Sequence, residues 1–201
     1  GFQIRSIVAS SLLQICGTAP FDDIRPFSMS YLPSTHTLFI KTNNRLYQVD
    51  PHTCVVKSSC ALSPDLLYIA VDKATGLLYA MSQLGFVALV DPTDCSFCHF
   101  CEVDFTNVGG LSTGIEIIGD MLYVNGPTGI AMAPLTGPTA CTITQIVTYP
   151  VPNINGDITA LSDTQIIGYS FSSNEYFTLD IPTSTITQLT TSLPLRGGGI
   201  T

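Results

Sequence analysis

The feature that most restricts the fold of this chain is an internal repeat. The segment Leu46–Cys54 (LYQVDPHTC) reappears as Val87–Cys95 (VALVDPTDC), and the two Asp-Pro turns are 41 residues apart. Weaker copies are Gly129–Cys141 and Tyr176–Thr183. A fixed period of this size predicts a chain built from successive copies of one supersecondary unit.

Each repeat contains short β-rich segments that are separated by turn residues. The first segments of the four repeats are Phe27–Tyr31, Leu67–Val71, Gly114–Ile118 and Asp157–Leu161. The second segments are Thr37–Lys41, Leu77–Met81, Met121–Val124 and Gln165–Tyr169. Apolar and polar residues alternate after the Asp-Pro type turns, as in Thr142–Ile146 and Thr185–Leu189. No window combines a 3.6-residue apolar period with helix caps, so the sequence predicts an all-β fold.

Four short strands in each repeat of about 40–46 residues is the spacing of a β-propeller blade. The pattern Leu-Tyr-x-x-Asp-Pro-x-Thr resembles the degenerate propeller repeats of the YVTN and NHL-like groups, and the resemblance runs from Pro26 to Leu195. It implies a β-propeller of about five four-stranded blades and implies nothing about chemistry. The chain has no Trp, which separates it from WD40 repeats, and it lacks the paired glycines of kelch blades. A β-sandwich is the main alternative fold.

We expect a single domain over residues 1–201, with blades at approximately 26–63, 66–105, 109–150 and 154–195. Residues 1–20 resemble the last two strands of a blade, and residues 196–201 resemble the first strand of another. Together they predict a partial blade. Either the two termini share this blade and close a five-blade ring, or another segment completes it and the chain is part of a longer protein.

Composition excludes several classes of protein. Apolar residues make up 45% of the chain and charged residues only 11%, against roughly 25% charged residues in an ordinary soluble domain. The net charge of −8 argues against nucleic acid as a partner. No stretch reaches the roughly 18 apolar residues of a membrane-spanning helix.

Hydroxyl side chains supply most of the polarity, with 18 Ser and 24 Thr. Such a surface suits a protein that is covered by neighbouring subunits or by O-linked sugars. The chain has no Asn-x-Ser/Thr sequence, so N-glycosylation is not expected.

The charge is distributed unevenly along the chain. Between Ala74 and Leu195 there is no Lys or Arg, whereas this stretch holds ten Asp and Glu residues. A field of this sign favours cations or basic partners, and Asp120 and Asp157 are candidates for an acidic axial mouth. The simpler interpretation is that these acids only keep the protein soluble.

Seven cysteines are candidates for disulfide bonds: Cys16, Cys54, Cys60, Cys95, Cys98, Cys101 and Cys141. Their number and the low charge favour an oxidising, extracellular or cell-surface location. The sequence begins at Gly1 with neither a signal peptide nor an initiator Met, as expected of a processed protein. An odd count leaves one thiol unpaired or bonded to another chain.

The spacing of the cysteines leaves their connectivity open. Cys60 follows Cys54 by six residues, and Cys101 follows Cys95 by the same interval. Residues six apart in a straight strand are separated by about 20 Å, whereas the α-carbons of a disulfide are about 4.4–6.8 Å apart. Either the outer strand is broken between them or they pair elsewhere. One arrangement that neighbouring outer strands would allow joins Cys98 to Cys141.

The cluster Cys95–Cys101 (CSFCHFC) also invites a metal interpretation. Its two-residue gaps resemble the start of an iron–sulfur motif, and His99 offers a nitrogen ligand. However, the expected fourth Cys followed by Pro is missing, and a zinc site usually has two separated ligand pairs. We therefore expect disulfides here, and no metal or cofactor.

The sequence holds no assembled catalytic constellation. Gly110–Gly114 matches the Gly-x-Ser-x-Gly nucleophile elbow around Ser112, but no helix follows it, so the small residues are expected to let a strand approach the axis. His36 and His52 lie in turns and are interpreted as solvated residues.

An alternation of oxygen-bearing residues suggests calcium but does not complete the motif. Asn153, Asn155 and Asp157 alternate as in an EF-hand loop, yet Thr164 stands where that loop needs Glu. We therefore expect an Asn-rich turn, no catalytic, cofactor or metal residues, and no enzyme.

These observations predict a non-enzymatic extracellular structural or adhesive module. It would assemble with itself or pack with other chains in a filament, sheath or surface coat, because open blade edges can be completed by a neighbouring strand. One alternative is a propeller that binds a ligand, glycan or basic protein in an acidic axial mouth. A second alternative is a propeller hydrolase or lyase.

Overall fold

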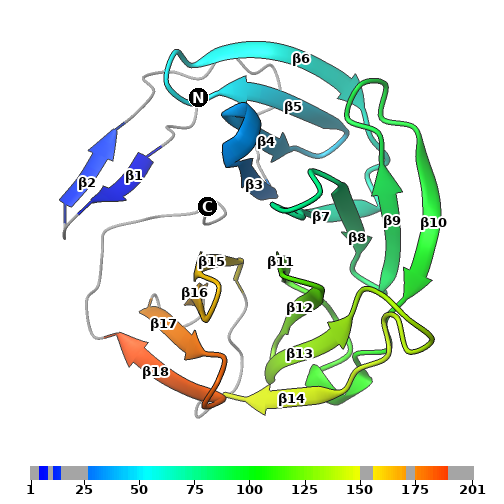
Figure 1. The fold of residues 1–201 in the computed structure, drawn as a ribbon, viewed down its shortest axis with the longest axis vertical. Helices are drawn as coiled ribbons and strands as arrows, with labels where there is room; N and C mark the ends of the chain where they lie inside the picture. The colour runs from blue at the N-terminus through cyan, green and yellow to red at the C-terminus, as the bar shows by residue number, and fades with distance from the viewer. Residues whose placement is uncertain (1–4, 9–10, 15–26, 150–155, 171–174, 190–201) are drawn as a thin grey trace.

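The computed structural model describes residues 5–8, 11–14, 27–149, 156–170 and 175–189. These residues form antiparallel sheets arranged around a common axis, as in a β-propeller (Figure 1). Blade 1 consists of β3 (Ser28–Leu32), β4 (Thr37–Lys41), β5 (Arg45–Asp50) and β6 (Val55–Ala61). Blade 2 consists of β7 (Leu66–Val71), β8 (Leu78–Ser82), β9 (Phe86–Val90) and β10 (Phe97–Glu102).

The remaining described strands complete two further blades and one small sheet. Blade 3 consists of β11 (Gly114–Ile118), β12 (Met121–Gly126), β13 (Gly129–Pro134) and β14 (Gln145–Thr148). Blade 4 consists of β15 (Ile158–Ser162), β16 (Gln165–Ser170), β17 (Glu175–Asp180) and β18 (Thr185–Leu189). β1 (Arg5–Val8) pairs with β2 (Ser11–Gln14). Two 3₁₀ turns, η1 (Pro33–Thr35) and η2 (Thr106–Val108), lie in connections.

Within each blade the strands follow one another from the axis outward in chain order. The inner strands β3, β7, β11 and β15 are neighbours around the axis, because β7 contacts both β3 and β11, and β11 also contacts β15. Most of the described connections between consecutive strands of a blade are short turns, as expected for antiparallel neighbours, whereas residues 135–144 separate β13 from β14. The predicted all-β propeller is therefore confirmed.

The predicted number of about five blades is close to what the described residues show. The described residues form four complete four-stranded blades and the two-stranded sheet β1–β2. Residues 196–201, which were expected to add a first strand to a shared blade, lie outside the described residues. The closure of a fifth blade across the termini stays a prediction.

Apolar side chains are packed between blades in layers that follow the two-residue period of the strands. On β12, Leu122 and Val124 face blade 2, whereas Tyr123 lies in the layer shared with blade 4. A third layer packs blade 1 on blade 2 and includes Phe39 and Ile69. Burying one large apolar side chain contributes about 1.5–3 kcal/mol, so these layers hold the ring together.

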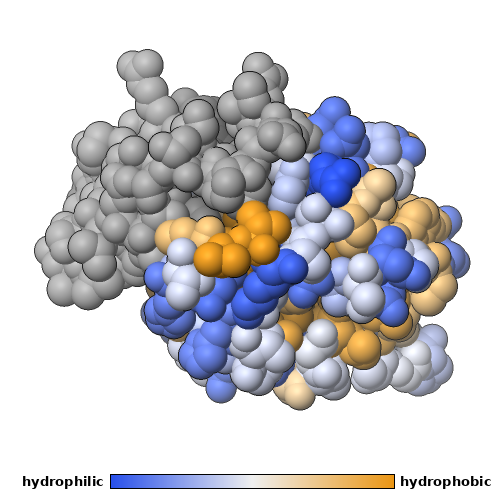
Figure 2. Space-filling model, turned by 90° about the horizontal axis from the view of Figure 1, so that it is seen from above, coloured by the Kyte–Doolittle hydropathy of each residue, from blue (hydrophilic) through white to orange (hydrophobic). Residues whose placement is uncertain are grey.

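Burial decreases from the axis to the rim. Every residue of β4 is buried, whereas β10 has an almost fully exposed pattern. The outer strands also carry exposed apolar side chains, with Val55 57% exposed, Phe97 47% and Phe100 38%. Figure 2, which views the rim from the side of β6, shows apolar groups interspersed with polar ones.

Candidate functional site

A polar network surrounds the axis and joins the four blades. The inner strand of a blade has an open edge, so its backbone N–H groups need partners from elsewhere. The N–H groups of Ile69 and Val71 on β7 donate to the hydroxyls of Ser28 and Ser30 on β3, at 3.2 and 2.9 Å. Hydroxyl groups of blade 1 thus accept hydrogen bonds from the open edge of the inner strand of blade 2.

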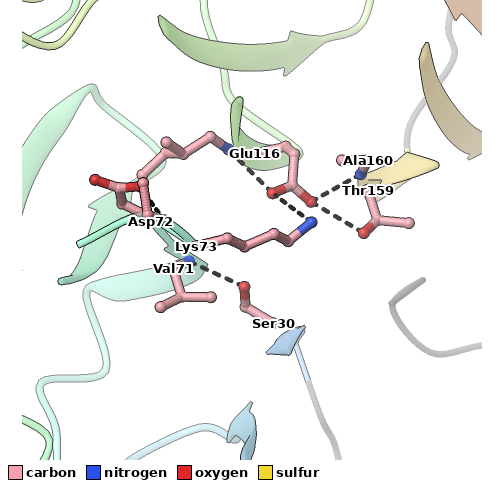
Figure 3. A network of polar contacts seen from close by, with 9 residues as sticks. Ser30, Val71, Asp72, Lys73, Glu116, Thr159 and Ala160 are labelled. Atoms are coloured by element: carbon pink, nitrogen blue, oxygen red, sulfur yellow. Dashed lines mark hydrogen bonds and ion pairs between the residues drawn. The ribbon is translucent and has the colours of Figure 1, made fainter. Parts of the chain in front are cut away.

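The carboxylate of Glu116 performs the same task between blades 3 and 4 (Figure 3). Its Oε2 accepts hydrogen bonds from the hydroxyl of Thr159 and the N–H of Ala160, both at 2.9 Å. Its Oε1 accepts from the N–H of Ile117 at 3.1 Å and lies 4.0 Å from Nζ of Lys73. Because Lys73 follows β7, this one side chain connects blades 2, 3 and 4.

A second buried carboxylate lies next to Glu116 because of a glycine. Gly114 precedes Glu116 by two residues, as Ser28 precedes Ser30 on β3. A Cβ at Gly114 would lie 2.5 Å from Oδ1 of Asp157. The missing side chain leaves room for this carboxyl group, whose Oδ1 accepts the N–H of Ile158 at 3.0 Å.

Asp157 has an unusual electrostatic environment. The residue is 4% exposed, and its Oδ2 has no hydrogen-bond partner among the residues that the structure describes. Burial raises its pKa well above the usual range, and the charge of Glu116 adds to this shift, while the N–H of Ile158 and the hydroxyl of Ser28 act against it. Burial, with a smaller effect of Asp157, also raises the pKa of Tyr68 on β7. The four inner strands thus converge on a carboxyl group that favours its neutral form.

Sequence reasoning identified only one of these axial groups. Asp157 was proposed for the axial mouth and does lie among the inner strands, but Asp120 is exposed in the β11–β12 turn. Glu116 and the two β3 serines were missed. Their signal was positional, because they are the polar residues inside the first β-rich segment of their repeats.

At the opposite, outer end of the blades, two disulfides connect neighbouring blades. Cys60 on β6 is bonded to Cys95 in the β9–β10 turn, with α-carbons 5.6 Å apart. Cys101 on β10 is bonded to Cys141 in the β13–β14 connection, with α-carbons 6.1 Å apart. We call this pair the rim disulfides. Each joins the outer strand of one blade to the turn of the next blade.

The other cysteines complete this picture in part. Cys54 also takes part in a disulfide, and Cys16 lies outside the described residues. Cys98 is an exposed free thiol, so the considered pairing of Cys98 with Cys141 is wrong. A bulge in β10 between His99 and Cys101 shifts the strand register, and Cys101 packs against the layer shared with blade 3, which brings it to Cys141.

The turns that carry the cysteines share one backbone geometry. Cys54, Cys95 and Cys141 have φ values of 60°, 62° and 62°, and Ser184 in blade 4 has φ 53°. Asp50 and Asp91 begin two of these turns, and the carboxylate of Asp50 accepts two backbone N–H groups while that of Asp91 accepts one. A left-handed backbone is unfavourable for most side chains. Because the three turns share it, their cysteines occupy the same position in each turn.

The structure also brings two of the three histidines together. The rings of His36, after η1, and His52, in the β5–β6 turn, have centroids 5.5 Å apart. Both residues are exposed, as predicted for solvated turn residues, but no sequence pattern indicated their contact. The third histidine, His99, stacks on Phe86 with centroids 4.9 Å apart.

Other sequence candidates carry no assembled chemistry. Ser112 is fully buried, and its hydroxyl donates to the carbonyl of Gly114 at 3.4 Å. Asn153 and Asn155 lie outside the described residues, and Thr164 is exposed in the β15–β16 turn. In the described part of the chain, no three His, Cys, Asp or Glu side chains gather closely enough to hold a metal ion.

The described residues contain no helix of the length and apolar character needed to cross a membrane. No protein-family model matches the sequence, and the comparison with curated proteins gave no match.

Solved structures match the fold. Hydrazine synthase of Kuenenia stuttgartiensis matches with a TM-score of 0.57 and 19% identity, over 84% of this chain and 50% of that chain. The structure of U3-55K matches with a TM-score of 0.59 and 9% identity, over 85% and 53%. The nidogen/laminin complex matches with a TM-score of 0.59 and 11% identity, over 89% and 67%.

This chain spans about half the length of the first two proteins that it matches. Identities this low show a shared fold only, and the chemistry of those proteins cannot be transferred to this chain. From its sheets, its repeat and its structural neighbours, the chain is a β-propeller.

Proposed function

We propose that this protein is a non-enzymatic extracellular structural module that packs through its outer rim with copies of itself or with other chains. The observation that carries the proposal is the position of the rim disulfides. They lie at the periphery and connect one blade to the next, where they resist separation of the blades. Disulfides of this kind persist in oxidising compartments, which supports an extracellular or cell-surface location.

The surface outside these disulfides supports packing with other chains. β6 and β10 are the outermost strands of their sheets, and among the described strands no other strand pairs with their outer edges. Open edges of this kind accept a further strand. Phe97 and Phe100 add exposed aromatic surface on β10, and the Ser- and Thr-rich composition suits either subunit contacts or O-linked sugars.

The test is electron microscopy of the native material, combined with its intact mass and with light scattering of the purified chain. We expect ordered polymers or discrete oligomers that are lost when Phe97→Ser and Phe100→Ser are combined. Leu84→Ser is the matched control, because Leu84 is an 82% exposed apolar residue that lies in the β8–β9 turn and not on an outer strand. Monomers at high concentration, at the mass of the bare chain, would overturn the proposal.

A second candidate function is recognition of a ligand or basic partner through the acidic axial region. The observation that favours it is the buried Oδ2 of Asp157, for which the described part of the chain supplies no partner. Binding of a basic partner needs the ionised carboxylate, so it should strengthen as the pH rises, weaken with added salt and be lost in Asp157→Asn. Asp120→Asn is the matched control, because it makes the same replacement in an exposed turn. Equal binding by both variants would contradict axial recognition.

A further inference from the structure

We propose that His36 and His52 form a binding site for one divalent transition-metal ion that prefers imidazole ligands, namely Cu²⁺, Ni²⁺ or Zn²⁺. Imidazole nitrogen is a good ligand for each of these ions. The chain has three histidines in total, and the fold brings two of them into contact from turns that are separated by two strands.

The distance between the two rings fits joint ligation. With metal–nitrogen distances of about 2.0–2.1 Å and a tetrahedral angle, two imidazole ring centres are about 5 Å apart. The observed separation of the centroids is 5.5 Å, with ring planes at 62°. A small rotation of exposed side chains would therefore place one nitrogen of each ring on the same ion.

The ring of His36 is already oriented by a neighbour. Its Nδ1 lies 3.1 Å from the hydroxyl of Tyr31. A hydrogen bond at one imidazole nitrogen fixes the ring and directs the other nitrogen toward a metal, as in known metal sites. Nε2 of His36 has no hydrogen-bond partner among the described residues, so it is available for this task.

Both histidines stand on turns whose backbone is fixed. The backbone of His36 is left-handed, with φ 47°, and its N–H donates to the carbonyl of Pro33 at 3.2 Å. Nζ of Lys57 donates to the carbonyl of His36 at 3.0 Å, which ties this turn to β6. The N–H of His52 donates to the carboxylate of Asp50 at 2.9 Å. Ligands held in this way lose little freedom on binding.

The charges near the pair are balanced. Lys57 places an ammonium group against the His36 turn. Oδ1 of Asp50 accepts the N–H groups of His52 and Thr53, which places a carboxylate against the His52 turn. The positive and the negative group offset each other. Two protein ligands leave the remaining positions of the ion open to water.

The test is titration of the purified chain with Cu²⁺, Ni²⁺ and Zn²⁺, followed by calorimetry, and electron paramagnetic resonance for Cu²⁺. All variants carry Cys98→Ser, which removes the free thiol as a competing ligand. We expect one ion per chain, the strongest binding for Cu²⁺, a two-nitrogen copper signal, and no binding of Ca²⁺ or Mg²⁺. His36→Asn and His52→Asn should each weaken binding at least tenfold.

The controls separate a metal site from a general effect on folding. Asn tolerates the left-handed backbone of position 36, so His36→Asn should keep the thermal midpoint of the parent. His99→Asn removes the third histidine and should leave binding unchanged. Binding that survives in His36→Asn or His52→Asn, binding that disappears in His99→Asn, or no saturable binding at all would overturn the proposal. None of these outcomes depends on the proposed structural role.

Discussion

Two neighbouring interfaces of this propeller, between blades 2 and 3 and between blades 3 and 4, are closed by different means. Both bury an apolar layer between the blades. At the rim, the first has the disulfide Cys101–Cys141, whereas the second has a hydrogen bond from the amide of Gln145 to the hydroxyl of Ser184. Within the described residues, the same architecture is therefore covalently linked on one side of blade 3 and not on the other.

The repeat explains how this difference arises. Cys141 and Ser184 occupy the same left-handed position of their turns. Six residues after Cys54 and Cys95 come Cys60 and Cys101, but six residues after Cys141 comes Val147. Blade 4 has the same turn, but Ser184 stands where the other turns have a cysteine. Blade 3 has the same outer strand, but Val147 stands where β6 and β10 have a cysteine. The comparison shows that the fold does not need the rim disulfide at every interface.

Removing a rim disulfide is expected to have the largest effect. The Cys101–Cys141 bond closes a loop with a sequence separation of 40 residues, for which chain entropy alone gives about 4 kcal/mol. The double variant Cys101→Ala/Cys141→Ala should lose about 2–4 kcal/mol in the free energy of unfolding by chemical denaturation. Cys98→Ser should lose almost nothing. A double variant as stable as the parent would show that packing alone holds blades 2 and 3.

Glu116 should be the main polar contributor to the interface between blades 3 and 4. Glu116→Ala leaves the part-buried N–H group of Ala160 and the buried N–H group of Ile117 without partners, which costs about 2–3 kcal/mol. Ser30→Ala, at the interface between blades 1 and 2, removes the acceptor of one N–H group and should cost about 1–2 kcal/mol. Thermal and chemical unfolding measure both. Equal losses would mean that the carboxylate does no more than a hydroxyl.

The stability of the axial region should depend on pH through Asp157. Its pKa is raised by burial in the folded state, so folding is favoured most below the unfolded pKa of about 3.9, and this contribution is lost as the pH rises through the folded pKa. A tenfold difference in proton affinity between the folded and unfolded states corresponds to about 1.4 kcal/mol. Asp157→Asn should abolish this decline in the free energy of unfolding.

The exposed turn aspartates give the opposite trend. Hydrogen bonds from Thr183 lower the pKa of Asp180, and hydrogen bonds from Ser96 lower that of Asp94. Their stabilisation is lost as the pH falls through their folded pKa. Comparing the pH profiles of the parent and of Asp157→Asn isolates the axial group, and identical profiles would contradict its assignment.

The smallest expected effect is a gain of stability when the missing disulfide is added. Val147→Cys/Ser184→Cys places thiols at the positions that correspond to Cys101 and Cys141, in a Cys98→Ser background. Because engineered disulfides often deliver less than the chain-entropy value, we expect a gain of about 1–2 kcal/mol for the oxidised over the reduced protein. Thiol counting checks that the bond forms. If the bond does not form, the interface between blades 3 and 4 differs from the disulfide-linked interfaces in its backbone as well as in its residues.

Much of the fold could be predicted from the sequence, because the repeat period and the turn residues of each copy indicate where the strands begin and end. The predicted segments Gly114–Ile118 and Thr185–Leu189 coincide with β11 and β18. The Asp-Pro turns placed the third and fourth strands of blades 1 and 2. The prediction of about five blades rested on the two termini, where residues 196–201 are not described, and the described residues form four complete blades.

The site was harder to predict because its groups meet only when the blades are assembled. Ser28 and Ile69 are 41 residues apart, and Glu116 and Thr159 are 43 apart. Nothing local distinguishes a serine that closes the edge of the next blade from one that faces solvent. The cysteine pairing had the same difficulty, since each rim disulfide joins two different repeats.

The sequence alone determined the all-β class, the repeat and its turns, because strand alternation and turn chemistry depend on residues a few positions apart. Only the tertiary structure decided which cysteines pair, which acid is buried at the axis and that His36 meets His52. These outcomes depend on how one blade packs against the next and on how turns of one blade converge. Contacts of this kind depend on how the blades are arranged around the axis. No repeated sequence pattern marks the residues that make them.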